Sequence, residues 1–422
     1  MKTQSTNKKK VTYTSKNMIK NITNVRGIEC WGAHTGVKSL RRDLALIYSV
    51  VPASAAAVFT QNQVIAEPVK VSKKHIKQSK GIARAIIVNA GNANACTGEQ
   101  GRLAAEAMAA TTAQELGIDV NQVLVASTGI IGEVFPVDDV LAGIKESVPK
   151  LSSKSSAGSF AANAILTTDT FPKEGFIEFE LDECEINMGG IAKGSGMIHP
   201  NMGTMLAFIV TDAAITPELL QTTLKELVDR TFNMITVDGD TSTNDTVFVL
   251  ANGKAKNTLI SSKKDPDYAA FRKNLEELML HLAKLIVSDG EGASKFINYK
   301  VTNAPNEQTA KIIARAVSSS SLVKTAMYGR DPNWGRIVSA AGNAGVPFDY
   351  EKICLRIGTE LELVKVLEDG HPIEYDKRLM KQMLRESHVV IEIDLKSGKK
   401  TATAWGTDLT TDYVLFNSVY TT

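Results

Sequence analysis

The 422-residue sequence predicts an α/β fold, because two strand-like runs in its N-terminal half are joined by a helix-like segment. Ile82–Asn89 and Val123–Ala126 are compact apolar runs, and Arg102–Leu116 between them is rich in alanine at helical spacing. Strands that alternate with a helix are the pattern of an α/β layer. The length allows two domains or one large layered body.

Small and polar residues mark the ends of these three elements. Gly91 and the asparagines of segment 90–98 tolerate positive φ, so a tight loop should follow the first strand. Gly117 is typical of a helix C-terminus. Ser127-Thr128-Gly129 should open a turn after the second strand, and the Ser/Lys-rich stretch Pro149–Gly158 should be a loop.

Similar patterns continue to the C-terminus. Phe176–Leu181 and Ile186–Ile191 predict a strand pair around the polar turn Asp182–Glu185, and Met205–Val210 is apolar throughout, as in a strand buried on both faces. Thr216 before Pro217 is a helix N-terminus signal. The remaining expected elements are helices at Pro217–Arg230 and Asp267–Val287 and strands at His388–Leu395, Thr401–Ala404 and Tyr413–Phe416.

Composition argues against several functional classes. The chain has 48 Lys+Arg against 46 Asp+Glu, a formal charge of +2, so nothing steers it strongly toward nucleic acid or an anionic membrane. No apolar run approaches the roughly 18 residues of a membrane span. Residues 1–27 are basic but lack the apolar core of a secretory signal, which predicts a flexible, solvated tail on a cytoplasmic protein.

The cysteines and histidines predict no metal site. Cys30, Cys96, Cys184 and Cys354 stand far apart, none belongs to a CxxC pair, and the six histidines show no ligand spacing. Reduced, buried thiols are therefore expected. No metal or other bound cofactor is predicted.

Two local strings invite functional interpretations that their spacing does not support. Lys193-Gly194-Ser195-Gly196 has its lysine before the glycines, whereas a phosphate-binding loop has it after them. The string that begins at Asp238 resembles the start of a calcium loop, but position six is Thr243 and position twelve is Val249. A polar hydrogen-bonded turn is predicted there instead.

Thr204 is a candidate nucleophile because it stands at the start of the buried run Met205–Val210. A hydroxyl at the mouth of a rigid strand is well placed for catalysis. Most threonines at strand starts are structural, so position alone leaves that alternative open.

The residues around Thr204 resemble a known family. The string KGSGMIHPNMGTMLAFIVTDA at 193–213 is similar to the signature of the ornithine acetyltransferases (glutamate N-acetyltransferases) of arginine biosynthesis. The resemblance extends in order from about Ile28 to Thr422. It includes VNAGNANACTG at 88–98, STGIIGE at 127–133, ILTTDTFPK at 165–173, DGDTSTNDT at 238–246, SDGEGASKF at 288–296, YGRDPNWGRI at 328–337 and FNSVYTT at 416–422.

The resemblance implies a self-cleaving precursor. Cleavage between Gly203 and Thr204 would give an α chain of residues 28–203 and a β chain of residues 204–422. Family members usually have alanine before the cut, and Gly203 departs from that pattern. The freed α-amine of Thr204, with an intrinsic pKa of ~7.7–8.0, could then take the proton of its own hydroxyl.

The resemblance also implies roles for other residues. Thr128, through its hydroxyl, and Gly129, through its N–H, match the family's oxyanion-stabilising pair. The hydroxyl of Thr167 matches a substrate contact, with neighbouring Thr168 as the other candidate for that hydroxyl. The full set of implied substrate-binding residues is Thr167, Lys193, Thr204, Glu291, Asn417 and Thr422.

The implied activity is acetyl transfer from N-acetylornithine to glutamate by double displacement through acetyl-Thr204. Some members also accept acetyl-CoA, which leaves it open as a co-substrate. An α₂β₂ heterotetramer and a two-domain fold of the N-terminal-nucleophile type, similar to self-cleaving aminopeptidases, are further family expectations. The alternatives are a self-cleaving aminopeptidase or amidohydrolase, in which water resolves the acyl-enzyme, and a non-catalytic small-molecule binder.

Overall fold

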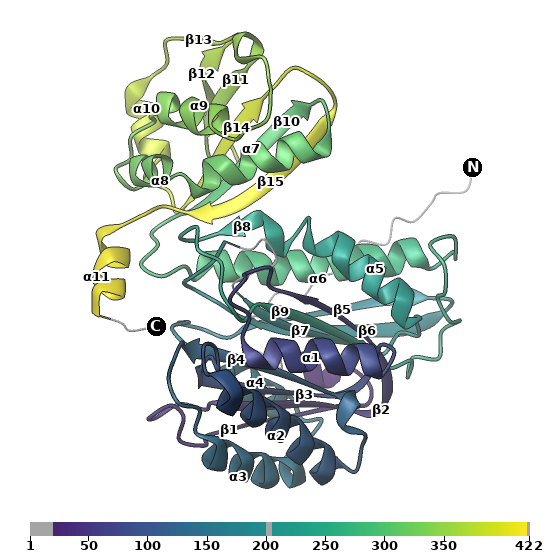
Figure 1. Cartoon of the computed structure of the whole chain (residues 1–422). Coiled ribbons are helices and arrows are strands. Elements are labelled where there is room, and N and C mark those ends of the chain that lie inside the picture. Colours follow the sequence, from purple (N-terminus) through teal and green to yellow (C-terminus); the bar gives the residue numbers. More distant parts are fainter. Residues whose placement is uncertain (1–19, 200–204, 420–422) are drawn as a thin grey trace, which may run out of the picture.

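The computed structural model describes residues 20–199 and 205–419, which form two β-sheets with helices packed against them (Figure 1). The predicted α/β class is confirmed. No helix in these two ranges combines the length and apolarity needed to cross a membrane.

The first sheet is mixed, with the order β4-β3-β2-β9-β7-β6-β5 and with β1 paired to β2. Strands β3 and β4 are parallel, as are β7 and β9, and the other neighbours are antiparallel. The bounds are β1 Ile28–Ala33, β2 Leu44–Phe59, β3 Ile82–Asn92, β4 Val123–Ile130, β5 Lys173–Leu181, β6 Cys184–Lys193, β7 Leu206–Thr211 and β9 Thr246–Ala251.

Helices cover both faces of this sheet because its central strands are apolar on both sides. In strand β7, Phe208 packs in the core on the α4 side, and Ile209 packs with α5 and α6 on the opposite face. Helices α2 and α3 cover the β3–β4 end. The bounds are α1 Glu67–Gln78, α2 Gly98–Leu116, α3 Val137–Ser147, α4 Ser155–Ala164, α5 Pro217–Val228 and α6 Tyr268–Ser288.

The second sheet has the order β13-β12-β11-β14-β10-β15-β8. It shares one apolar core with α5, α6 and one face of the first sheet, through residues such as Tyr299 and Ile391. Its strands are β8 Ile235–Thr236, β10 Phe296–Ala304, β11 Cys354–Gly358, β12 Leu363–Glu368, β13 His371–Pro372, β14 His388–Asp394 and β15 Lys400–Thr407. The accompanying helices are α7 Glu307–Ser319, α8 Ser321–Tyr328, α9 Trp334–Gly342 and α10 Lys377–Met383.

Most predicted elements are confirmed with small shifts of their ends. Gly117 ends α2 in the left-handed conformation, at φ 64°, and Pro217 opens α5 after Thr216. The β5–β6 turn is tighter than predicted, because Asp182 and Glu183 alone form it, both at positive φ, as in a type I′ hairpin.

Four predictions of local structure are wrong. Ser127-Thr128-Gly129 does not open a turn but continues strand β4. Tyr413–Phe416 is not a strand but part of helix α11, Thr411–Val419. The hydroxyl of Thr410 caps this helix by accepting the N–H of Tyr413. Ser155–Gly158 forms the first turn of α4 rather than a loop.

The fourth correction concerns the predicted tail. Residues 20–27 are packed against the protein: Ile22 and Val25 are buried, and the Asn21 amide donates to the Ser155 carbonyl 2.8 Å away. Apolar Ile22 and Val25 outweigh the basic composition on which the tail prediction rested. Residues 1–19 lie outside the described ranges.

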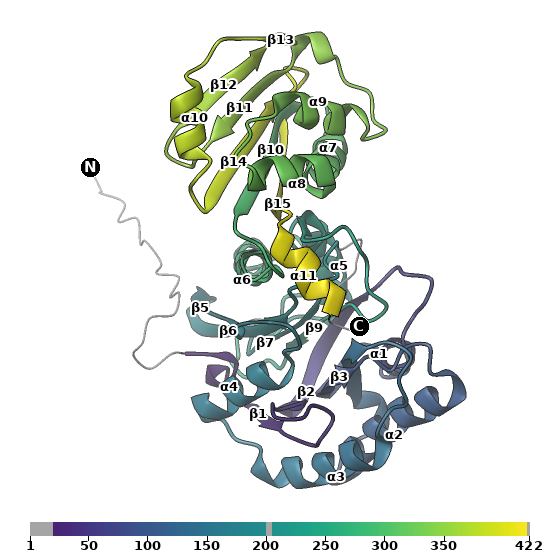
Figure 2. The ribbon, with the colours of Figure 1, turned by 90° about the vertical axis from the view of Figure 1, so that its left-hand side faces the viewer.

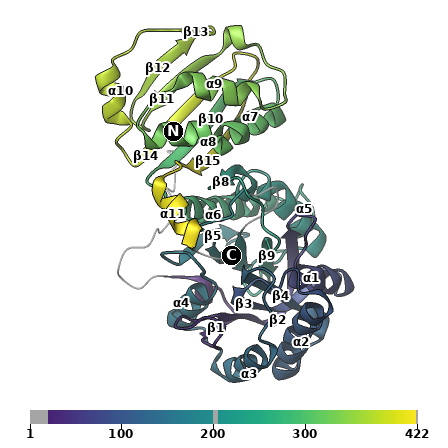
Figure 3. The same ribbon diagram turned by 60° about the vertical axis from the view of Figure 1, so that its left-hand side comes forward.

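The first sheet draws strands from both sides of the predicted cleavage junction. Strand β6 ends at Lys193 and β7 begins at Leu206, and the two pair antiparallel from Met188↔Thr211 to Lys193↔Leu206. Chains 28–203 and 204–422 would therefore share one hydrogen-bonded sheet. Helix α11 leaves β15 and returns toward the first sheet, next to the loop after α6, where Asn417 of α11 contacts Glu291 (Figures 2 and 3).

Candidate active site

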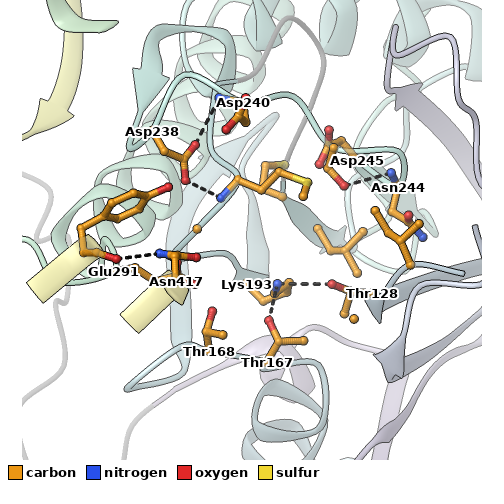
Figure 4. Close-up of a pocket in the computed structure, with 18 residues that line it drawn as sticks. Thr128, Thr167, Thr168, Lys193, Asp238, Asp240, Asn244, Asp245, Glu291 and Asn417 are labelled. Carbon is orange, nitrogen blue, oxygen red and sulfur yellow. Dashed lines mark hydrogen bonds between the residues drawn. The ribbon is translucent and has the colours of Figure 1, made fainter. Parts of the chain in front are cut away.

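A cavity of about 180 Å³ gathers most of the predicted site residues (Figure 4). Thr128 and Gly129 come from β4, Thr167 from the loop after α4, and Lys193 from the end of β6. Glu291, from the loop after α6, and Asn417, from α11, complete the predicted residues that line it. Met205, which follows Thr204 in the sequence, also lines this cavity. The predicted Gly203, Thr204 and Thr422 lie outside the described residues.

Lys193 connects two of the predicted hydroxyls. Its ammonium donates to Thr167 Oγ1 at 2.7 Å and to Thr128 Oγ1 at 3.3 Å. The neighbouring Thr168 hydroxyl instead pairs with Ser195 Oγ at 2.6 Å. Of the two candidate threonines, Thr167 is therefore the one bonded to Lys193.

A buried ion network lies behind Lys193. Lys173 contacts both Asp169 and Asp289, and Asp169 accepts the N–H groups of Gly194, at 2.7 Å, and Thr167, at 3.0 Å. Burial alone would raise the pKa of Asp169, but the Lys193 and Lys173 ammonium groups outweigh it and lower the pKa to about 2. The network fixes the loop that carries Thr167.

Lys193 is the one cationic side chain among the described residues that line the cavity, which also holds four carboxyl groups. Burial lowers the pKa of Lys193, and the Asp169 carboxylate opposes that shift. An ammonium so placed is a good partner for a carboxylate, because charge-assisted hydrogen bonds are roughly twice as strong as neutral ones.

Gly129 occupies a position that only glycine fits. Its φ is +135°, and a Cβ there would lie 2.2 Å from the backbone carbon of Gly91 on β3. This close approach holds the end of β4 against β3, with Thr128 immediately before it. A larger residue would displace the Thr128 hydroxyl from Lys193.

The turn at Asp238 is confirmed as a hydrogen-bonded turn. The Asp238 carboxylate accepts the N–H groups of Met197 at 2.6 Å, Ile198 at 2.8 Å and Asp240 at 3.2 Å. Burial raises the pKa of Asp238 even so. These bonds hold the backbone after β6 against the loop between β8 and β9. That loop forms one wall of the cavity.

Helix α11 closes another wall with two side chains one turn apart. The Asn417 amide donates to Glu291 Oε2 at 3.1 Å. Tyr413 lines the cavity, and burial, followed by Asp238 and Glu291, raises the pKa of its phenol. Tyr413 therefore stays protonated and can donate a hydrogen bond at neutral pH.

Several cavity residues were not predicted as site residues. Asp238, Asp240, Ser242, Asn244 and Asp245 come from the string DGDTSTNDT, and Tyr413 from the helix mispredicted as a strand. Asn244 ties this loop to the first sheet by donating to the carbonyls of Ala93, at 2.6 Å, and Ser127, at 2.9 Å. Their one signal in the sequence was that DGDTSTNDT at 238–246 resembles a motif of the family.

Groups of metal-ligating side chains and disulfides are both absent from the described part of the chain. Within residues 20–199 and 205–419, no group of three His, Cys, Asp or Glu side chains is arranged to hold a metal ion. All four cysteines are free. Cys30 and Cys354 are buried as predicted, but Cys96 is exposed in the loop before α2.

Comparisons with known proteins identify the family. The model of the ArgJ family matches residues 29–422. The arginine biosynthesis bifunctional protein ArgJ of Listeria monocytogenes is 48% identical over 402 residues, covering 95% of this chain and 98% of that protein. The protein of the same name from Caldanaerobacter subterraneus is 46% identical over 397 residues, covering 94% and 97%.

One solved structure, ornithine acetyltransferase complexed with ornithine from Mycobacterium tuberculosis, is 35% identical with a TM-score of 0.40, covering 43% of this chain and 95% of that chain. The family model and both relatives extend over nearly the whole chain. The chain therefore belongs to the ArgJ family.

Proposed function

We propose that this protein transfers the acetyl group of N-acetylornithine to glutamate, by double displacement through an acetyl-Thr204 ester, in arginine biosynthesis. Membership of the ArgJ family supports the pathway and reaction class. The observation that carries the proposal is the cluster of Lys193, Thr167 and Thr128 in one cavity with Glu291. That cavity offers partners for both a carboxylate and an ammonium.

The proposed nucleophile is produced by cleavage between Gly203 and Thr204. A threonine hydroxyl needs a base, and the freed α-amine, with an intrinsic pKa of ~7.7–8.0, can accept its proton. The hydroxyl oxygen then attacks the acetyl carbonyl, and the acetyl–nitrogen bond breaks as ornithine leaves. Glutamate reverses these steps and leaves as N-acetylglutamate.

Thr128 and Gly129 are the proposed donors to the oxyanion of each tetrahedral intermediate. Lys193 donates to Thr128 Oγ1, which leaves the proton of that hydroxyl free to be donated elsewhere. The Lys193 charge also makes the hydroxyl a stronger donor. An oxyanion donor of this kind is typically worth ~2.7–4 kcal/mol in the transition state.

Substrate selection follows from the charges around the cavity. Lys193, with Thr167, would hold the α-carboxylate that both substrates share. Glu291, fixed by Asn417, would receive the side-chain ammonium of ornithine. Thr422 remains a predicted contact from the sequence resemblance.

Further expectations accompany this proposal. The two chains would stay associated because β6 and β7 pair across the junction, and an α₂β₂ cytoplasmic assembly without a bound cofactor is the family expectation. The relatives are named bifunctional, which supports acetyl-CoA as a second acetyl donor.

Replacement of the nucleophile tests the proposal. Thr204→Ala should abolish cleavage and transfer, whereas Thr204→Ser should retain part of both. Varying N-acetylornithine and glutamate together should give parallel double-reciprocal lines. Wild-type turnover in Thr204→Ala would refute the assignment, and acetate release without glutamate would favour the hydrolase alternative.

A further inference from the structure

Asp245 is a buried carboxyl group of the cavity to which no role has yet been given. It is 4% exposed and directly precedes β9, which runs parallel to β7. The Thr246 N–H donates to the Met205 carbonyl at 3.0 Å, and the backbone N–H of Met205 hydrogen-bonds to the Asp245 carboxyl. Asp245 thus lies beside the start of β7, on the cavity wall.

One oxygen of this carboxyl has no partner. Asp245 Oδ2 is buried and accepts or donates no hydrogen bond within the described part of the chain. A buried polar group left unsatisfied costs about 1–3 kcal/mol, and more if it is charged. The backbone N–H groups of Met205, Ser242 and Asp245 itself therefore bond to the other oxygen, Oδ1. The unpaired oxygen of Asp245 is therefore available to a ligand.

The surroundings favour the protonated form of this group. Burial raises the pKa of Asp245 well above its usual range, against the opposing effects of the Met205 N–H and the Lys193 ammonium. The other ionisable groups of the cavity, Asp238, Asp240, Glu291 and the Tyr413 phenol, supply no positive charge to offset a carboxylate. Burial therefore favours the carboxylic acid over the carboxylate, which suits Asp245 to hold a proton.

The proposed reaction needs a proton store of this kind. The hydroxyl proton of Thr204 converts the departing nitrogen of ornithine into a neutral amine, but an amino acid carries an ammonium in neutral solution. Glutamate arrives as an ammonium and cannot attack the ester until it loses a proton. One proton must therefore be supplied in the first half-reaction and removed in the second.

We propose that Asp245 carries this proton between the two half-reactions, an inference that rests on the proposed acetyl transfer. In the first, the acetyl–nitrogen bond breaks, the Thr204 ester forms, and the Asp245 carboxyl gives its proton to the departing amine. In the second, glutamate returns a proton to the Asp245 carboxylate and its neutral amine takes the acetyl group. The atoms and charges balance without a proton from solvent.

The location of the substrate nitrogen is consistent with this role. Lys193 is the proposed partner of the α-carboxylate, and the α-nitrogen is attached to the same carbon. That nitrogen must then lie within the cavity that Lys193 and Asp245 share (Figure 4). Asp169, the other carboxylate near Lys193, is already occupied by Lys173 and two N–H groups.

The proton balance of one half-reaction tests this inference. Cleaved wild-type enzyme is mixed with N-acetylornithine, without glutamate, in weak buffer containing a pH indicator, and acetylation is counted by mass spectrometry. We expect no net proton uptake by the wild type. Asp245→Asn should take up one proton per acetylated site and should react about 10²–10⁴-fold more slowly, the usual range for a lost general acid. Asp139→Asn, at an exposed carboxyl on α3, is the matched control and should behave as the wild type.

A second readout does not need the variant to fold or cleave. In the infrared difference spectrum of the wild type, acetylation should remove the carbonyl stretch of a protonated carboxylic acid. Uptake of one proton per site by the wild type, an unchanged carboxylic acid band, or a wild-type proton balance in Asp245→Asn would overturn the inference. An absent acetyl mass would instead refute the proposed function itself.

Discussion

Replacing Lys193 with methionine removes the cavity's ammonium while keeping most of the side-chain volume. The Lys193 ammonium is 2.7 Å from Thr167 Oγ1 and 3.3 Å from Thr128 Oγ1, so both hydroxyls lose a donor. A hydrogen bond to a charged group is worth about 1.5–3 kcal/mol. At 1.4 kcal/mol per factor of ten, loss of the substrate carboxylate contact predicts a fall in kcat/KM of about 10- to 150-fold.

Steady-state kinetics measures this loss for each substrate separately. Because the α-carboxylate is common to N-acetylornithine and glutamate, kcat/KM should fall for both. Asp169 keeps its contacts with Lys173 and the Gly194 N–H, so circular dichroism should show a folded variant. Lys225→Met, at an exposed lysine of α5, should keep wild-type kinetics. Unchanged kcat/KM in folded Lys193→Met would refute the assigned role of Lys193.

Three further predictions concern other residues of the site. Thr128→Val should lower kcat by about 10²–10³-fold with a smaller effect on KM, because an oxyanion donor acts in the transition state. A variant with unchanged kcat and a KM raised by that factor would contradict this. Glu291→Gln should raise the KM for N-acetylornithine by about 10- to 150-fold and the KM for glutamate by less, since it removes the charge that faces the ornithine ammonium. Equal changes in the two KM values would contradict the assignment. The pKa of Asp169 is lowered to about 2 when folded, against ~3.9 when unfolded. Ionised Asp169 therefore contributes about 2–3 kcal/mol to the free energy of unfolding, a contribution present above pH ~4 and lost as pH falls toward ~2. In acid unfolding experiments, the free energy of unfolding of Asp169→Asn should not show this loss.

The elements with strong local signals were predictable from the sequence. Strand β7 is apolar at nearly every position because it is buried on both faces, and Gly117 ends α2 because glycine adopts a left-handed φ without strain. Helix α11 was mispredicted because Val, Leu and Phe follow one another in it. The cap by Thr410 outweighs that preference, and none of the residues of α11 is buried.

The longest strand of the first sheet was not predicted. Strand β2 is 16 residues long and carries five alanines and Pro52, which are poor strand formers. Its register against β3 shifts between Tyr48 and Ala53, and Pro52 lies in that irregular stretch. Pairing with β1, β3 and β9 stabilises what its local sequence does not favour.

The site could be predicted only through the family resemblance. Thr128, Thr167, Lys193 and Glu291 are far apart in the sequence, and no spacing rule brings them together. Their convergence depends on the β6–β7 pairing and on the Lys173 ion network. The unpaired oxygen of Asp245 is a property of packing that no sequence pattern reveals.

Mass spectrometry of the denatured protein tests the central claim, that Thr204 carries the acetyl group, most directly. The purified protein should separate into two chains, the second beginning at Thr204. Incubation with N-acetylornithine alone should add one acetyl mass to that second chain, located on Thr204 by fragmentation, and glutamate should remove it as N-acetylglutamate forms. A single intact chain with full transfer activity, or transfer without any acetylated chain, would contradict the account.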